Sequence, residues 1–220
     1  MNVRCVLHMG CDPYGFGILA EDRLLVVHHF QPNYSDSEGV VDLIAAALER
    51  VSLQLSDIEA CIWVNGPGSY TGLRIGASLV NMLKLSFKCP VYSVDTWTAF
   101  AYSVSRPQGA FGIVCPGMRG YVAVRLFSAD HSHLVPLGDG EMLMKDRFFD
   151  HVQQRFPKVP FYGPLSQDDL LEGRSCSISY TSVCLDMVRL GISFTEPLFS
   201  ALDAGQWVVP NYLGQAVRAQ

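Results

Sequence analysis

Charged side chains are scarce in this chain of 220 residues. Asp, Glu, Lys and Arg make up 17% of the sequence and hydrophobic residues 49%, whereas an average soluble domain carries about 25% charged residues. A composition this rich in apolar residues excludes intrinsic disorder. Because little charge is available to cover the surface, we expect one apolar face that contacts another molecule.

The sequence also has no cluster of basic residues. Sixteen Lys and Arg stand against 21 Asp and Glu, which gives a formal net charge of −5. Tight binding of nucleic acid requires clustered cations that neutralise phosphates. The charge pattern therefore disfavours tight nucleic-acid binding by this chain alone.

Paired cysteines and long apolar runs are absent as well. No two of the seven cysteines form a C-x-x-C pair, a pattern typical of reduced thiols rather than of a disulfide or zinc framework. No apolar run reaches the roughly 18 residues that a spanning helix needs. Polar residues interrupt the apolar start before a signal-peptide core is complete. We therefore expect a cytoplasmic protein with no membrane contact.

The hydrophobic pattern predicts two units of similar build. In the first, we expect strands at 4–9, 18–20, 24–27, 58–64 and 91–94, with helices at 40–51, 70–87 and up to residue 104. Strand, helix, strand order implies parallel pairing. In the second, we expect strands at 111–115, 121–127, 134–137 and 159–162, with helices at 145–156, 170–174, 182–190 and 197–204. Pro107 and Gly109 mark the boundary, so we predict lobes at residues 1–106 and 107–220, with the last helix allowed to return to the first lobe.

One glycine-rich segment carries most of the functional information, and it reads Gly66-Pro67-Gly68-Ser69-Tyr70-Thr71-Gly72-Leu73-Arg74-Ile75-Gly76. It lies between an expected strand and helix, where backbone amides at a helix start could bind a phosphate. It is not a P-loop, because no lysine follows the glycines until Lys84. It is not G-x-G-x-x-G either, because the third glycine comes one residue late.

The same glycines, at positions 68, 72 and 76, also repeat every four residues. A glycine inside a helix costs about 1 kcal/mol relative to alanine, which indicates that another element needs close access to this backbone. In one interpretation that element is a helix of another protein, and in the other it is this chain's own sheet. We favour the docking surface, because the chain is poor in charge and the neighbouring helix at 40–51 is apolar nearly all round.

The segment from Gly66 to Gly76 resembles, without a gap, the motif G-P-G-S-[FY]-T-G-L-R-I-G of the TsaB family. The segments Asp95-Thr96-Trp97-Thr98-Ala99 and Pro210-Asn211-Tyr212-Leu213-Gly214 take the places of two further family motifs. The resemblance is specific from about residue 40 to residue 105 and architectural beyond. It implies an α/β protein with the two-lobed, RNase H-like fold of the actin-like ATPase (ASKHA) superfamily and duplicated mixed sheets.

The resemblance implies an accessory subunit that is not an enzyme by itself and holds no cofactor or metal. TsaB proteins act with a larger paralogue, TsaD, and the ATPase TsaE in attaching a threonylcarbamoyl group to tRNA. The resemblance implies a TsaD-like partner bound through the helices at 40–51 and 70–87, a TsaE-like ATPase in the larger assembly, and only indirect contact with tRNA. We also expect a homodimer when the chain is alone, because an apolar patch without its partner tends to bind a second copy. The residues expected at the partner surface are Gly68, Tyr70, Gly72, Leu73, Arg74, Gly76, Ala77, Val80, Val41, Ile44, Ala45 and Leu48.

Two departures from the family pattern concern ATP binding. The family's first strand commonly ends I-D-T-S, whereas glycine, Gly10, stands here at the place of that aspartate. The second-lobe motif D-A-R-R-G-E-V-Y has Pro116 and Tyr121 at its two acidic positions. Missing carboxylates in both lobes leave little to hold magnesium. An ATP-binding small-molecule enzyme, with residues 66–69 as its phosphate loop, and an inactive peptidase-like homodimer stay open as alternatives.

The histidines do not predict a metal site. His28 and His29 are adjacent in an expected strand and should point to opposite faces. His131 and His133 have no evident third ligand. The sequence contains no H-E-x-x-H or H-x-x-E-H motif of a metallopeptidase.

Overall fold

The computed structural model describes residues 2–12, 14–30, 39–104, 109–117, 119–129, 133–165, 170, 180–182, 185–193, 197–203 and 205–212. Contacts divide the chain into two compact units, Met1–Asp95 with Met187–Asn211 and Thr96–Asp186 with Tyr212–Gln220. The chain therefore passes from the first unit to the second after Asp95, whereas the sequence placed this boundary at residue 106. The reason is that helix α4 (Thr96–Ser103) packs on strands of the second unit.

A six-stranded mixed sheet forms the first unit, in the order β12-β5-β4-β1-β2-β3. Its strands are β1 (Val3–His8), β2 (Tyr14–Ala20), β3 (Arg23–Phe30), β4 (Ile58–Val64), β5 (Val91–Val94) and β12 (Ser200–Leu202). Strand β1 pairs antiparallel with β2 and parallel with β4, and β4 pairs parallel with β5. The meander and the parallel pairs agree with the sequence prediction.

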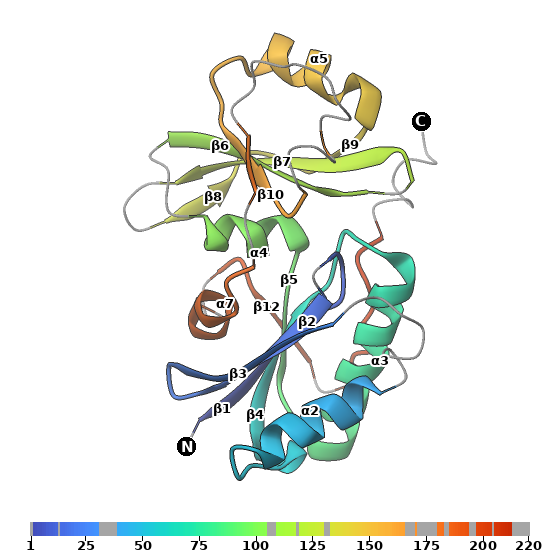
Figure 1. Ribbon diagram of the computed structural model, residues 1–220, viewed down its shortest axis with the longest axis vertical. Helices are drawn as coiled ribbons and strands as arrows, with labels where there is room; N and C mark the ends of the chain where they lie inside the picture. The colour runs from blue at the N-terminus through green and yellow to red at the C-terminus, as the bar shows by residue number, and fades with distance from the viewer. Residues whose placement is uncertain are drawn as a thin grey trace. The chain divides into compact units, whose positions relative to one another are not determined.

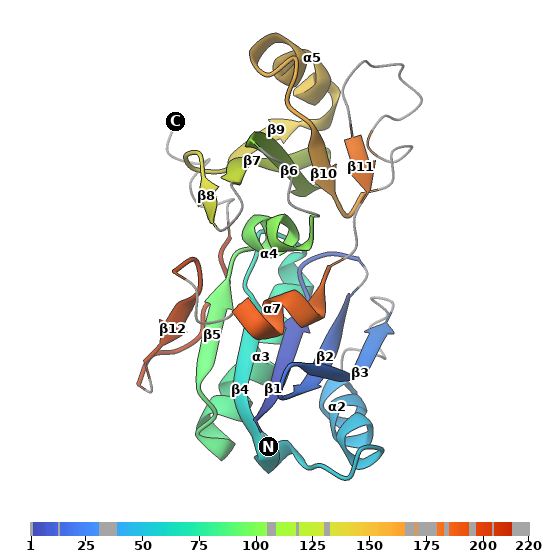
Figure 2. The ribbon, with the colours of Figure 1, turned by 90° about the vertical axis from the view of Figure 1, so that its left-hand side faces the viewer.

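Helices cover both faces of this sheet. The odd-numbered β1 residues Val3, Cys5 and Leu7 join the core formed with α2 (Val40–Glu49), the 3-10 turn η1 (Leu55–Asp57) and α3 (Tyr70–Phe87). The even-numbered Arg4 donates from its Nη1 to the carbonyl of Gly191, at 2.5 Å, in α7 (Met187–Ser193). Successive side chains of a strand point to opposite faces, so a strand buried along its whole length needs cover on both. Figures 1 and 2 show α2 and α3 on one face and α7 on the other.

The second unit repeats this arrangement around the order β11-β10-β6-β7-β8, with β9 also paired to β7. Its elements are β6 (Gly109–Pro116), β7 (Tyr121–Ala129), β8 (Leu134–Pro136), β9 (Glu141–Met144), α5 (Lys145–Arg155), β10 (Phe161–Gly163) and β11 (Tyr180–Ser182). As in the first unit, an antiparallel pair, β6 and β7, is followed by parallel pairs, β6 with β10 and β10 with β11. The two corresponding strand orders confirm the predicted α/β fold with duplicated mixed sheets.

The core of the second unit combines aliphatic residues with a group of phenylalanine rings. Phe148 of α5 packs edge-on against Phe149 and Phe161, at centroid distances of 5.0 and 6.0 Å. Helix α4 contacts β6, β7 and β8, while α5 contacts β7 and β9. No helix in the described ranges is long and apolar enough to cross a membrane.

The predictions for the C-terminal part were partly wrong. Residues 197–204, expected as a helix, contain β12, which pairs antiparallel with β5. The helix expected at 182–190 begins only at Met187, and Ser182 ends strand β11. Strand β9 was not predicted. A short apolar run is ambiguous between helix and strand, and here the open edge of a sheet supplies hydrogen-bond partners for extended backbone. Of the helix expected at 170–174, residues 171–174 lie outside the described residues.

Candidate docking surface and glycine-rich loop

The loop between β4 and α3 is held by contacts within the first unit. The amide of Ser69 donates to the carbonyl of Gly10 at 2.5 Å, and the amide of Leu73 donates to that of Ser69 at 2.9 Å. Ser69 also caps α3, because its Oγ accepts from the amide of Gly72 at 3.3 Å. These three amides already have acceptors within the chain. The interpretation of the loop as a phosphate cradle therefore gains no support from its hydrogen bonds.

The glycine stripe faces this chain's own backbone. A Cβ added at Gly68 would lie 2.1 Å from the carbonyl oxygen of Gly10, and one at Gly72 would lie 2.1 Å from that of Met9. At Gly76 a Cβ would approach the Met9 side chain to 3.2 Å. The interpretation of the stripe as bare backbone for a partner is wrong. Its alternative is correct, because the missing side chains let α3 lie directly against the segment that follows β1.

Burial divides the residues that we expected at the partner surface. Seven belong to this chain's own interior, and they are Gly72, Leu73, Gly76, Ala77, Val80, Ile44 and Leu48. A residue buried beneath its own helix shapes the surface above it and does not touch a partner. The other five are exposed or half-buried, and they are Gly68, Tyr70, Arg74, Val41 and Ala45. Their role in binding stays a prediction.

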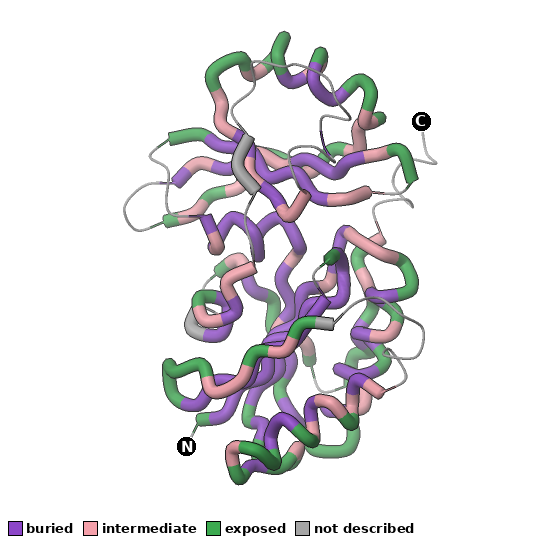
Figure 3. Tube along the Cα trace, in the orientation of Figure 1, coloured by how far each residue is buried: buried purple, intermediate pink, exposed green. Residues whose placement is uncertain are grey.

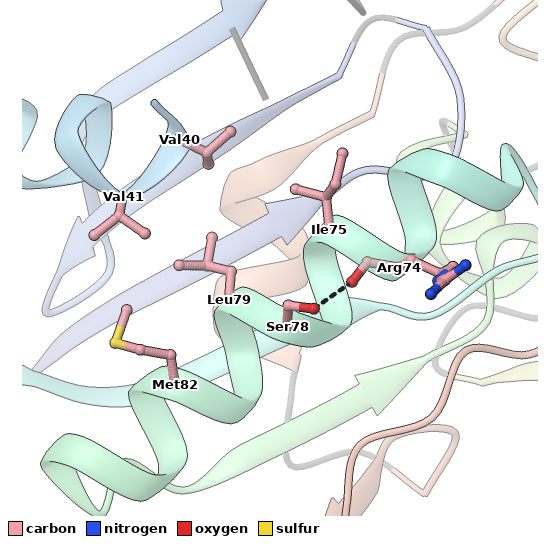
Figure 4. A pocket seen from close by; sticks show the side chains of 7 residues that line it. All are labelled: Val40, Val41, Arg74, Ile75, Ser78, Leu79 and Met82. Carbon is pink, nitrogen blue, oxygen red and sulfur yellow. Dashed lines mark hydrogen bonds between the residues drawn. The ribbon is translucent and has the colours of Figure 1, made fainter. Parts of the chain in front are cut away.

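A groove lies between α2 and α3. It has a volume of about 360 Å³ and is lined by Val40, Val41, Arg74, Ile75, Ser78, Leu79 and Met82. Figure 4 shows the side chains of Ile75, Leu79 and Met82 pointing toward Val40 and Val41 of α2. Figure 3 shows that both helices carry exposed and half-buried residues along their outer side. The groove is therefore mostly apolar, with Val40 and Leu79 buried in it and Val41, Ile75 and Met82 half-buried and open to contact.

A polar rim borders this groove at the start of α3. Tyr70 is 61% exposed, and the Arg74 guanidinium carbon lies 5.4 Å from the centre of its ring. Arg74 Nη1 also donates to the Tyr70 hydroxyl at 3.4 Å. In Figure 4 the Arg74 side chain points away from α2. An aromatic ring with an adjacent cation, beside an apolar groove, is a composition typical of protein interfaces.

Sequence reasoning missed four α3 residues of the groove, namely Ile75, Ser78, Leu79 and Met82. A signal for them existed in their spacing, because positions three and four apart share one face of a helix. Three of the four are apolar, and that face lies about a quarter turn from the glycines. The glycine repeat drew attention to the wrong side of the helix.

Neutral side chains flank Gly10, which stands at the place of the family's aspartate just after β1. Burial lowers the pKa of His8 to about 4, so its ring is uncharged near neutral pH. Burial also raises the pKa of the Cys11 thiol, whose Sγ lies 3.3 Å from His8 Nε2. Asp12 is exposed. A neutral imidazole and a protonated thiol do not fit a magnesium–nucleotide site, which needs oxygen ligands with negative charge.

The buried histidine predicts a pH dependence of stability. In the unfolded chain His8 takes up a proton near its usual pKa of 6.5, whereas in the folded protein it does so only near pH 4. The unfolded state therefore binds more protons between these values, and stability falls as pH decreases from about 6.5 to 4, by about 3 kcal/mol in total. Urea unfolding at pH 7, 5.5 and 4.5 measures this loss. His8→Leu should show a shallower decline, and an identical slope in both proteins would contradict the assignment.

The described part of the chain offers no metal centre. In the described ranges, no three His, Cys, Asp or Glu residues lie close enough together to hold a metal ion. His28 stacks on Phe16 at a centroid distance of 5.5 Å, whereas its neighbour His29 is exposed. His131 lies outside the described residues. The described cysteines, at positions 5, 11, 61, 89 and 115, are free thiols in buried positions.

Comparison with known proteins links these features to two related groups. The model of the family described as TsaD, tRNA N6-adenosine threonylcarbamoyltransferase, matches residues 35–140. The protein "tRNA threonylcarbamoyladenosine biosynthesis protein TsaB" of Bacillus subtilis is 22% identical over 149 residues, which cover 68% of this chain and 65% of that protein. The Escherichia coli protein of the same name is 31% identical over 74 residues, 34% of this chain and 32% of that protein. The matches thus span less than two thirds of the length of these relatives.

The chain is also similar to a TsaD-type enzyme in sequence and to a solved structure in fold. The tRNA N6-adenosine threonylcarbamoyltransferase of Tropheryma whipplei is 30% identical over 118 residues, 47% of this chain and 29% of that enzyme. The structure of YeaZ from Pseudomonas aeruginosa superposes with a TM-score of 0.74 at 19% identity, covering 97% of this chain and all of that one. This likeness shows that the two proteins share their fold.

Proposed function

We propose that this chain, which belongs to the TsaB/YeaZ family, is a non-catalytic subunit for threonylcarbamoyladenosine modification of tRNA and docks on a TsaD-type enzyme. A role in threonylcarbamoyladenosine modification is supported by two relatives that are named as TsaB proteins of this biosynthesis. The observation that carries the docking proposal is the groove between α2 and α3, where Val41, Ile75 and Met82 are half-buried apolar residues above buried Val40 and Leu79. Docking onto TsaD would stabilise that enzyme's active form.

The shape of the groove supports a helical partner. Ridges of side chains on one helix pack into grooves on another, and a pair of adjacent helices with an apolar furrow accepts such a ridge. The TsaD family model matches a segment that contains both α2 and α3. A TsaD-type protein would therefore carry a similar helix pair. Two similar pairs can pack face to face around a pseudo-twofold axis, in the manner of an isologous dimer.

The same groove favours self-association when the partner is absent, and the other partners belong to the proposal. Without TsaD, the groove can receive the equivalent helices of a second copy, so the purified chain forms a homodimer. A TsaE-like ATPase joins the larger assembly. Contact with tRNA is indirect, because the chain is acidic overall and lacks clustered cations. The protein works in the cytoplasm.

The alternative of an ATP-dependent enzyme has less support. It would need free amides at the start of α3 and carboxylates near the end of β1. The amide of Ser69 is bonded to Gly10, and buried His8 and Cys11 are neutral. Calorimetry with ATP and magnesium separates the two functions, because tight saturable binding by the isolated chain favours the enzyme.

Co-expression with the TsaD-type protein of the same genome tests the proposed function. We expect the two chains to co-elute in size-exclusion chromatography as one complex, and we expect threonylcarbamoyladenosine formation in a reconstituted reaction to require this chain. An unrelated ASKHA-fold protein of similar size serves as the negative control. Separate elution together with undiminished tRNA modification in its absence would reject the proposal.

A further inference from the structure

A segment near the C-terminus, residues 205–211, which we call the strap, is tied along α3 within the first unit. Lys84 Nζ donates to the carbonyl of Gln206 at 2.7 Å and to that of Asp203, just before the strap. The Asn81 side chain pairs with both backbone groups of Val208, at 3.2 and 3.0 Å. Further along, the amide of Asn211 donates to the carbonyl of Asn65 at 2.8 Å. In Figure 1 the C-terminal part of the chain passes beside α3.

Lys84, which binds the strap through hydrogen bonds, is a buried lysine. It is only 7% exposed, and burying an ammonium group is costly unless hydrogen bonds replace its water. The carbonyls of Asp203 and Gln206 supply those bonds. A lysine buried for this purpose indicates that the position of the strap matters to the protein.

The strap holds two large apolar side chains in solvent. Trp207 and Val209 are each 67% exposed, whereas Val208 between them is 4% exposed. Val208 joins the hydrophobic core of the first unit, so Trp207 and Val209 on either side of it form the outward face of the strap. Single exposed apolar residues are ordinary, but a tryptophan in a backbone that hydrogen bonds hold on both sides is not a loose surface residue.

This outward face borders the same helix as the groove. Asn81, which binds the strap, is next in sequence to Met82, which lines the groove. Successive helix residues are about 100° apart, so the groove and the strap flank α3 on two sides of its exposed crest. Ser78 and Leu85, exposed and seven residues apart, lie along that crest. A body that covers the crest and fills the groove therefore meets the strap as well.

We infer that the strap extends the docking surface of α2 and α3, and that Trp207 is an anchor residue for the TsaD-type partner. This inference rests on the proposed function. The TsaD-type partner would have an apolar pocket next to the partner's own helix pair. This pocket would take up the indole of Trp207, and Val209 would pack at its edge.

Trp207 can contribute to affinity in two ways, through the burial of its large indole and through the low entropy cost of a backbone that is already ordered. Tryptophan contributes more binding energy than most residue types at protein interfaces. Ordering a flexible segment on binding weakens affinity, and here the hydrogen bonds of Asn81, Lys84 and Asn65 have ordered the strap beforehand. The partner thus gains the burial of an indole without immobilising the backbone that carries it.

Affinity measurements with the full chain and the TsaD-type protein test the inference. We expect Trp207→Ala to weaken binding at least tenfold without changing the melting temperature, since the side chain is mostly exposed. Val135→Ala in β8, 51% exposed and in the second unit, is the matched control and should bind like the parent. Equal affinity of Trp207→Ala and the parent would overturn the inference and leave the proposed function intact.

Tryptophan fluorescence supplies a second readout. Of the three tryptophans, Trp63 and Trp97 are 0% and 3% exposed, so acrylamide should quench Trp207 selectively in the free chain. The difference between the parent and Trp207→Phe, each measured alone and in complex, isolates the signal of Trp207. We expect protection in the complex, and unchanged quenching there would overturn the inference. If the parent itself forms no complex, the proposed function fails first and the inference fails with it.

Discussion

Replacing Gly72 with alanine is expected to destabilise the folded chain by about 2 kcal/mol. The added Cβ would lie 2.1 Å from the carbonyl oxygen of Met9 and 2.8 Å from the Tyr14 ring. The nearer atom belongs to the backbone, so relief requires α3 to move away from the segment after β1. Overpacking of this kind costs about 1–3 kcal/mol or more, and the better helix propensity of alanine, about 1 kcal/mol, offsets only part of it. Chemical denaturation followed by circular dichroism measures the loss.

Two other glycines serve as controls for this prediction. At Gly76 the closest atoms are side-chain atoms of Trp63 and Met9, at 3.0 and 3.2 Å, which can shift, so Gly76→Ala should cost clearly less than Gly72→Ala. At Gly205 nothing lies within 4 Å, and Gly205→Ala should change stability by no more than about 0.5 kcal/mol. Parent-like stability of Gly72→Ala would mean that the stripe does not pack inward.

Introducing a carboxylate at Met82 is expected to abolish binding of the TsaD-type partner. Met82 is half-buried in the groove, opposite Val41 of α2. In the free chain the open groove keeps a glutamate in water, so folding should be nearly unaffected. In the complex, the docked helix would bury this charge without a partner, which is strongly unfavourable. We expect at least a hundredfold weaker binding, equivalent to about 2.7 kcal/mol, in a titration of labelled partner.

Met144 offers a matched control for the charge. Met144→Glu makes the same substitution at a residue that is 41% exposed and belongs to the second unit. Both variants change the net charge equally, so only the effect of position separates them. Met144→Glu should bind like the parent, and Met82→Glu should also reduce self-association of the purified chain. Parent-like binding by Met82→Glu would show that the partner docks elsewhere.

The regular elements of the first unit were predictable because their signals are local. The run from Ile58 to Val64 is apolar except for Glu59 and is followed by turn residues, and it forms β4 as expected. The helix expected at 70–87 is α3 with the same bounds, and Ser69 caps it. The weakly patterned C-terminal part was harder, since whether residues 200–202 become strand depends on the edge of β5, about 110 residues earlier in the chain.

Lys84 illustrates what the sequence could not indicate about the candidate site. In the sequence it mattered only as a lysine too distant from the glycines to complete a P-loop. In the folded chain its ammonium holds the carbonyls of Asp203 and Gln206. In the sequence Lys84 is separated by 119 positions from Asp203 and by 122 positions from Gln206. No local pattern predicts a contact over such a distance, and only the folded structure shows it.

The sequence by itself indicated the type of fold, the order of the principal elements and the resemblance to the TsaB family, because periodic hydrophobicity and an eleven-residue motif are written in consecutive residues. The tertiary structure decided which way the glycine stripe faces, which side of α3 is open and where Trp207 is held. A repeat along a helix states which residues share a face, but it does not state what lies against that face. That depends on packing with β1 and with the strap, which only the folded chain brings next to α3.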